Sequence, residues 1–510
     1  MRRLHEAIGA VETYSPAEER FNRRRRTAGL FLAPAALLLV LLLPMPGLSG
    51  SGHRLAAVMA AVVVLWVSEA LPMAVTAMLG PALAVVFQVA LARRALAAFA
   101  DPIIFLFIGS FVLAEAMFVH GLDRRIAFTT LSSRLVGASA VRMLVAYGGV
   151  ATLISMWISN TATTAMLFPI GLSIVGHVGL RGTAPPEVIR RFAISMMLVT
   201  SFAASVGGMA TPVGTPPNLI GMGFIERLGG QEISFLTWSR LGVPLVLVMT
   251  TLLLGWFAWW GARGLRVDAE GLALVRAERD ALGPWTRGQR NVVAAFAAAV
   301  FLWVAPGLAA MVGQGESAAM RVFAGSVPES VAALIGAVLL FLLPIDWRQR
   351  RFTLTWEQAA GIDWGIILLY GGGLALGDLA FQTGLAGWLG AALTSVMPVQ
   401  TELALTIAFT AAAILLSEAT SNAASANMIV PVAIAVAQAA GVSPLRPALA
   451  ATLGASMGFM MPISTAPNAI VYSSGYVPIG AMIRHGLLLD IASFVVIVAL
   501  VTLLGPLVGL

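Results

Sequence analysis

The chain has 510 residues, of which 59% are hydrophobic and only 11% are charged, and its formal net charge is +7. Soluble domains carry about 25% charged residues, so this composition excludes an ordinary soluble protein. The sequence contains no cysteine, which excludes disulfides, thiolate metal sites and thiol chemistry. Long apolar runs recur along the chain and approach the roughly 20 residues that cross a bilayer. They indicate a polytopic, all-α membrane protein.

The chain begins with an arginine-rich segment, residues 1–28. The sequence NRRRR at 22–26 stands before the first apolar run, and no small-residue cleavage site follows, so it is not interpreted as a cleaved signal. Positive charge beside a span is a topology signal far more often than a nucleic-acid site. Crossing helices are then predicted at 29–47, 54–74, 76–92 and 103–121.

Two later segments, 141–180 and 402–440, are predicted as re-entrant hairpins, because each is long enough to enter the membrane and leave again. Each contains a polar stretch near its middle: SNTATTAMLFPI begins at Ser159, and SNAASANMIVPV begins at Ser421. The other crossing helices, which bring the predicted total to eleven, are 192–222, 241–262, 291–311, 330–345, 364–383, 446–475 and 485–508.

The arginine distribution supports this trace. With the N-terminus inside, 24 of the 31 basic residues fall on the inner side of the membrane. That bias is the one expected for cytoplasmic loops. The predicted protein therefore lies in the cell (inner) membrane with a cytoplasmic N-terminus, and the odd number of spans places the C-terminus outside.

Three blocks of sequence occur twice in the same order. FIGSFVLAEAMFVHGL (107–122) aligns with YGGGLALGDLAFQTGL (370–385) at an offset of 263, and Glu115 thereby meets Asp378. The Ser-Asn stretches follow at an offset of 262, and TPVGTPPNLI (211–220) meets MPISTAPNAI (461–470) at 250. In the trace the first copy starts outside and the second inside. The chain is therefore predicted to be an inverted repeat, a layout typical of secondary transporters.

The paired motifs contain chemistry that suits small ions. Proline breaks a helix and frees carbonyl oxygens, which can bind a hard cation such as Na⁺. Asn and Thr side chains can donate to a carboxylate, as can the N–H groups of new helix N-termini. A single Ser or Thr in a membrane helix most often bonds only to its own backbone. Two copies, each paired with a proline-broken Pro-Asn segment, favour a shared site near the midplane.

The chain resembles the divalent anion/sodium symporter family, the carriers of dicarboxylates, citrate and sulfate. The resemblance covers nearly the whole chain from about residue 29, and the motifs that carry it are Ser159-Asn160-Thr161, Ser421-Asn422, GTPPN at 214–218, STAPN at 464–468 and WVSEALPM at 66–73.

The resemblance implies a homodimer that works by an elevator motion. The scaffold would comprise 29–140 and 291–400, the mobile transport domain 141–262 and 401–510, and 263–290 would be a cytoplasmic linker. One Na⁺ site would use Ser155, Ser159, Asn160 and the Gly214 carbonyl. The second would use Ser417, Ser421, Asn422 and the Ser464 carbonyl. The dicarboxylate would contact Asn160, Thr161, Thr215, Asn422 and Thr465.

One position departs from the family pattern. Ala423 stands where family members usually have a hydroxyl, and losing a hydrogen bond to a charged group costs about 1.5–3 kcal/mol if nothing replaces it. Ser425 and Thr465 are the candidates to replace it. The asymmetry suggests that the two ends of the substrate are recognised differently.

The predicted function is Na⁺-coupled symport of C4-type dicarboxylates such as succinate or malate. Open alternatives are a Na⁺-independent dicarboxylate exchanger and proton coupling through Glu418, an ionisable residue near an apolar span. From another class, the alternative is an ion channel or a membrane receptor. An enzyme is not expected, because no nucleophile–base pair, metal-ligand cluster or phosphate loop stands out.

Overall fold

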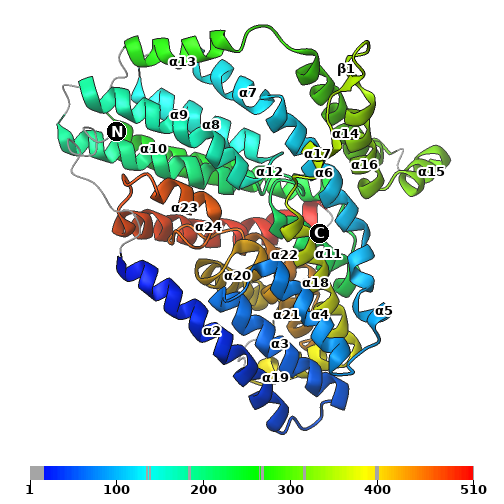
Figure 1. Ribbon diagram of the computed structural model, residues 1–510. Coiled ribbons are helices and arrows are strands. Elements are labelled where there is room, and N and C mark those ends of the chain that lie inside the picture. Colours follow the sequence, from blue (N-terminus) through cyan, green and yellow to red (C-terminus); the bar gives the residue numbers. More distant parts are fainter. Residues whose placement is uncertain are drawn as a thin grey trace.

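Figure 1 shows the computed structural model, which describes residues 16–133, 136, 139–181, 185–263, 265, 269–313, 317–396 and 401–508. Residues 1–15 of the predicted N-terminal segment lie outside these ranges. Within these ranges the regular structure is helical apart from one short antiparallel pair of strands, β1 (Pro344–Asp346) and β2 (Arg351–Phe352). The prediction of a helical membrane protein is confirmed, with this small addition.

In the part of the chain that the structure describes, seven helices precede the first hairpin. In chain order they are α2 (Pro16–Leu42), α3 (Gly50–Ser68), α4 (Met73–Val86), α5 (Ala92–Ala95), the 3-10 helix η1 (Ala97–Ala100), α6 (Pro102–Val119) and α7 (Leu122–Leu131). α3 packs against both α2 and α4. Asp101 begins α6, because its carboxylate accepts the N–H of Ile103 at 3.0 Å.

The first hairpin and its broken helix occur where the sequence predicts them. They consist of α8 (Ala140–Ser155), α9 (Asn160–Arg181), α10 (Pro186–Gly207) and α11 (Pro216–Gly229), followed by α12 (Phe235–Phe257) and the π-helical turn η2 (Ala258–Ala262). The predicted span 192–222 is therefore interrupted at 208–215, the stretch that contains TPVGT.

The middle of the chain contains a helix inside the predicted linker. The elements are α13 (Ala269–Ala281), α14 (Arg287–Met311), α15 (Ala318–Ser326), α16 (Glu329–Leu342), α17 (Trp356–Ala359), α18 (Trp364–Gln382) and α19 (Leu385–Val396). α13 packs against α7 and α9, and its Val275 is buried. This part of the linker is thus packed against the protein rather than fully solvated.

The second hairpin repeats the plan of the first. It consists of α20 (Glu402–Ala419) and α21 (Asn422–Ala439), and then come α22 (Leu445–Gly454), α23 (Ala466–Tyr472) and α24 (Ile479–Val508). The predicted span 446–475 is broken between α22 and α23, at the stretch that contains MPIST.

The number of spans agrees with the prediction, although the helices that make it up differ. Among the described residues, ten helices are long and apolar enough to cross a membrane, or eleven if α15 and α16, bent by 66°, form one span. α4 is too short to qualify with 14 residues, whereas both arms of the second hairpin, α20 and α21, do qualify. Composition cannot distinguish a crossing arm from a re-entrant one, because both are apolar and helical.

The two repeats interlock at the centre of the molecule. α23 packs against α9 and α10 of the first repeat, and α11 packs against α21 and α22 of the second. Figure 1 shows the C-terminal helices α23 and α24 in the middle, between α10 and α2. This exchange brings each broken helix to the opposite hairpin.

An ion-pair network joins α11 to its neighbours. Arg227 of α11 bonds Asp101 at 3.0 Å and Asp378 of α18 at 2.8 Å. The Tyr370 hydroxyl donates to Asp101 at 3.0 Å. Asp378 therefore has a structural partner, while its repeat equivalent Glu115 lies in a cavity.

Candidate functional site

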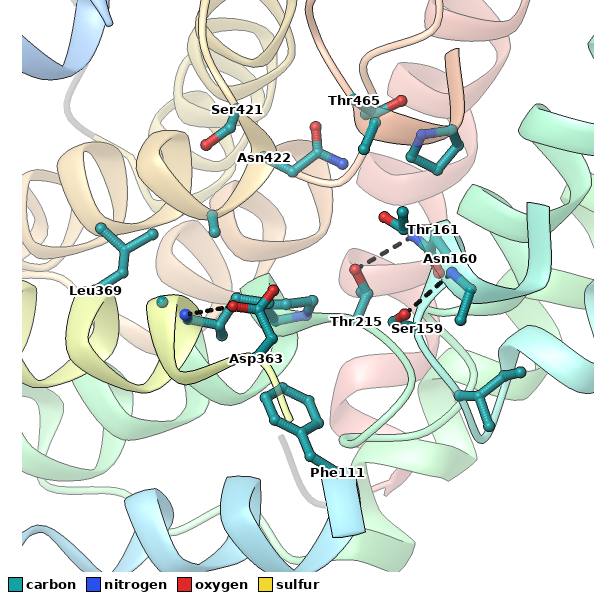
Figure 2. Close-up of a pocket in the computed structure, with 18 of the residues that line it drawn as sticks. Phe111, Ser159, Asn160, Thr161, Thr215, Asp363, Leu369, Ser421, Asn422 and Thr465 are labelled. Carbon is teal, nitrogen blue, oxygen red and sulfur yellow. Dashed lines mark hydrogen bonds between the residues drawn. The ribbon is translucent and has the colours of Figure 1, made fainter. Parts of the chain in front are cut away.

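A cavity of about 780 Å³ lies where the hairpin tips and the broken helices meet. Figure 2 shows the first tip with Thr215 on one side and the second tip with Thr465 across from it. The cavity brings together the predicted residues Ser159, Asn160, Thr161, Thr215, Ser421, Asn422, Ser464 and Thr465. Ser155, Gly214 and Ser417 lie behind this lining.

The first tip is held by a short chain of side-chain hydrogen bonds. Ser159 caps α9 by accepting the N–H of Ala162 at 3.2 Å. The Ser155 hydroxyl, fully buried, donates to Asn160 Oδ1 at 2.8 Å. Asn160 Nδ2 donates to Thr215 Oγ1 at 3.4 Å. The tip is thereby tied to the broken helix of its own repeat.

The second tip has nearly the same geometry. Ser421 caps α21 through the N–H of Ala424 at 3.3 Å, and Ser417 Oγ donates to Asn422 Oδ1 at 2.8 Å. Asn422 Nδ2 donates to the Ser456 carbonyl at 3.3 Å. The two Ser-Asn motifs thus build matching local structures, which is why the sequence contains both.

Buried asparagines hold the two breaks in shape. Asn218 Nδ2 donates to the carbonyls of Gly208 at 2.9 Å and Thr211 at 2.8 Å. Asn468 Nδ2 donates to the carbonyls of Gly458 at 2.9 Å and Met461 at 3.0 Å. The Pro-Asn motifs were recognised in sequence, but this clamping role was not.

Oxygen atoms converge on Gly208 and Gly214 behind the first tip. A Cβ on Gly208 would lie 2.3 Å from Asn160 Oδ1 and 3.1 Å from the Gly214 carbonyl oxygen. A Cβ on Gly214 would lie 2.9 Å from the carbonyl oxygens of Ser155 and Met156. Unwound backbone carbonyls with a side-chain amide form the kind of ligand set that holds Na⁺ in transporters.

The second break has a related arrangement around Gly458. A Cβ there would lie 3.1 Å from both the carbonyl and the hydroxyl oxygen of Ser417, and 3.0 Å from Ser464 Cβ. Gly458 follows Gly208 at the offset of 250 that relates the Pro-Asn segments. Sequence reasoning missed both glycines, and extending that offset a few residues backwards could have found them.

The structure shows where Ala423, the residue that lacks the hydroxyl usual in the family, lies relative to the site. Ala423 lines the cavity, and so does Thr465. Ser425 is fully buried, and its hydroxyl bonds to Thr420 Oγ1 at 2.7 Å, so it does not line the cavity. Of the two candidates to replace the hydroxyl, only Thr465 has access to a ligand.

The opposite wall of the cavity is acidic, a feature that sequence reasoning did not assign to the site. Glu115 of α6 and Asp363, which caps α18 through the N–H of Ile366 at 3.3 Å, both line it. Figure 2 shows Asp363 beside Phe111, away from the second tip. Among the described residues that line the cavity, none is Arg or Lys.

Known proteins resemble this chain over nearly its whole length. Residues 24–510 match the family model described as the sodium:sulfate symporter transmembrane region. The chain is 33% identical over 483 residues to the sodium-dependent dicarboxylate transporter SdcS of Staphylococcus saprophyticus, covering 94% of this chain and 91% of that protein. It is 32% identical over 487 residues to SdcS of Staphylococcus aureus strain MRSA252, with the same coverage.

A solved structure shares the fold. Neisseria gonorrhoeae MtrF, from a class of antimetabolite efflux pumps, aligns with a TM-score of 0.53 at 12% identity, over 98% of this chain and 97% of that one. At this identity the likeness concerns the fold alone. The family match and the SdcS relatives together show that the chain belongs to the sodium:sulfate symporter family, whose members are multi-pass membrane transporters and not enzymes.

Proposed function

We propose that the protein is a secondary active transporter that couples the uptake of C4-type dicarboxylates, such as succinate or malate, to Na⁺. The observation that carries the proposal is the meeting of two Ser-Asn tips and two broken helices around one cavity. The relatives named sodium-dependent dicarboxylate transporters support the same substrate class.

The donors around the cavity suit an anion with two carboxylates. Asn160, Thr161 and Thr215 would bind one end of the substrate, and Asn422 and Thr465 the other. Amide and hydroxyl groups can donate to a carboxylate. The second end has Ala423 in place of a hydroxyl, so it offers fewer donors.

The charge of the cavity favours Na⁺ coupling over simple exchange. Glu115 and Asp363 line it, and the described lining contains no Arg or Lys to balance a dianion. A dianion in such a site needs positive charge from elsewhere. Na⁺ bound behind each tip would supply that charge. One site would use Ser155, Ser159, Asn160 and the Gly214 carbonyl, and the other Ser417, Ser421, Asn422 and the Ser464 carbonyl.

The transport motion would carry the site across the membrane. In the proposed topology, with the N-terminus in the cytoplasm and the C-terminus outside the cell, the cavity lies at the cytoplasmic ends of α3, α6 and α18. The structure would then be the inward-facing state of an elevator. Arg227 would hold the outer end shut by joining α11 of the transport domain to Asp101 and Asp378 of the scaffold. In a homodimer, the scaffold domains of the two subunits would hold each other in place while the transport domains move.

Thermal stability of the purified protein tests this proposal. Na⁺ would be compared with K⁺ or choline at equal ionic strength, against succinate, malate, 2-oxoglutarate, citrate and sulfate. A ligand that binds only the folded state raises stability by mass action. Stabilisation by a dicarboxylate only when Na⁺ is present supports symport. Stabilisation that is indifferent to Na⁺ favours the exchanger, and stabilisation by sulfate alone contradicts the substrate class.

Replacing Thr161 by alanine is expected to raise the KM for succinate about tenfold or more, since one hydrogen bond to a charged group is lost. Thr161 is exposed to the cavity at the first turn of α9. Uptake into proteoliposomes at saturating Na⁺ measures this. The control is Thr251→Ala on α12, whose hydroxyl donates to its own helix at the Leu247 carbonyl, 2.7 Å away. A Thr161 variant with the KM of the control would remove Thr161 from the site.

Replacing Ala423 by threonine is expected to restore a donor to the second carboxylate. The KM for succinate should fall about tenfold or more, since the added hydrogen bond is to a charged group. Competition of unlabelled dicarboxylates against labelled succinate uptake would show whether the preference among substrates changes as well. An unchanged KM and an unchanged competition profile would mean that position 423 does not face the ligand.

A further inference from the structure

A buried carboxylate lies directly behind the second hairpin tip. Glu418, near the end of α20, is 7% exposed. Its carboxylate accepts the N–H of Met460 at 2.8 Å and of Met461 at 3.1 Å, and the hydroxyl of Ser464 at 2.8 Å. All three partners are donors, so the surroundings suit the ionised carboxylate. Glu418 therefore holds the stretch of chain that carries the Ser464 carbonyl.

Among the described residues, the hydrogen bonds that close the first break involve no charged side chain. The offset of 262 between the Ser-Asn motifs relates Glu418 to Met156. There the main-chain oxygen of Met156 accepts the hydroxyl of Thr211 at 2.5 Å. The Ser-to-Asn hydrogen bond of the tip is 2.8 Å in both repeats. The two breaks thus share their geometry near the tip and differ by one carboxylate.

Asp490 of α24 is a second buried acid, 4% exposed. Neither of its carboxyl oxygens has a hydrogen-bond partner among the described residues, whereas Glu418 accepts three donors from the second break. Asp490 therefore offers a comparison variant in which a buried carboxyl is removed while the break keeps all its hydrogen bonds.

We infer that Glu418 is a positioning residue that makes the second cation site bind Na⁺ more tightly than the first. It would act in two ways, by fixing the loop that presents the Ser464 carbonyl and by placing a negative charge behind the cation. Such a charge is weakly screened in a buried site, and among the described residues no carboxylate is hydrogen-bonded to the first break. This inference rests on the proposed Na⁺ coupling.

The test compares Glu418→Gln with Asp490→Asn in proteoliposomes. The glutamine keeps the shape and one acceptor oxygen but removes the charge. The Na⁺ concentration for half-maximal succinate uptake should rise about tenfold, the effect of one partly screened charge. The succinate KM at saturating Na⁺ should hardly change. Asp490→Asn leaves the Glu418 carboxylate and its three donors in place, so the Na⁺ dependence of this variant should stay close to wild type. Met156→Leu is the matched control in the first repeat.

The possible outcomes separate this inference from the proposed function. If wild-type uptake is indifferent to Na⁺, the proposed coupling fails. If wild-type uptake needs Na⁺ but Glu418→Gln shows an unchanged Na⁺ dependence, only the inference fails. The inference would also be overturned if Asp490→Asn raised the Na⁺ concentration for half-maximal uptake as much as Glu418→Gln does. If Glu418→Gln does not fold, Ser464→Ala removes the hydroxyl that Glu418 holds. The Ser464→Ala variant should need a several-fold higher Na⁺ concentration for half-maximal uptake, and an unchanged concentration would contradict the inference.

Discussion

Replacing Gly208 by alanine is expected to abolish Na⁺-dependent uptake. The new Cβ would lie 2.3 Å from Asn160 Oδ1, a distance that real Cβ atoms essentially never show, and 3.1 Å from the Gly214 carbonyl oxygen. Either the amide or the break must move, and both contribute oxygens to the proposed first cation site. Initial rates of succinate uptake should fall at least about a hundredfold, because a displacement of about 1 Å in a binding site can cost that much.

A matched control distinguishes a lost site from a damaged protein. Gly149 lies on α8 of the same hairpin, and a Cβ there would meet nothing within 4 Å. Gly149→Ala should therefore retain wild-type uptake. Stabilisation by Na⁺ without substrate should be weaker in Gly208→Ala, where only the second proposed site is left intact, and unchanged in the control. Normal Na⁺ stabilisation of Gly208→Ala would show that no cation binds there.

The general plan of the fold was accessible from sequence because it depends on periodic signals. Apolar runs and paired motifs predicted the helices, both hairpins and the repeat. The interruption at 208–215 was expected because prolines cannot continue a helix. The split of 446–475 was expected for the same reason, because MPIST also contains a proline. The short α4 was less accessible, since a hydropathy trace does not record where a helix stops inside an apolar run.

The polar residues of the site were predicted from the sequence, but the shape of the cavity around them was not. Ser159, Asn160, Ser421 and Asn422 stand out as polar groups in apolar sequence, and the structure brings them to one cavity. Gly208 matters because it has no side chain, which lets oxygen atoms approach its backbone closely. The sequence alone does not show which oxygens these are. Asp363 was missed for a different reason. It belongs to a helix start distant in sequence, and only the tertiary packing places it at the cavity.

Replacing Asn468 by alanine is expected to destabilise the protein by about 3 kcal/mol, because buried polar groups would lose their partner. Asn468 is fully buried. It donates to the carbonyls of Gly458 and Met461, and it accepts the hydroxyl of Ser201 at 2.5 Å. The alanine would leave the Gly458 carbonyl and the Ser201 hydroxyl unsatisfied, whereas the Met461 carbonyl would keep the N–H and the hydroxyl of Ser464. Thermal unfolding in detergent measures the loss, and stabilisation by Na⁺ should be weaker in the variant, because only the first proposed site keeps its shape.

Asn218, the equivalent residue of the first repeat, allows this loss of stability to be compared with that of a similar variant of the same protein. Asn218 makes the same two bonds to carbonyls, but its Oδ1 has no hydrogen-bond donor among the described residues. Asn218→Ala should therefore cost less than Asn468→Ala, by about the 1 kcal/mol of one hydrogen bond. Equal melting temperatures for the two variants would mean that the bond from Ser201 contributes nothing. If Asn468→Ala were as stable as the wild type, the clamp would not hold the break, whose shape would then come from its prolines and from packing between the repeats.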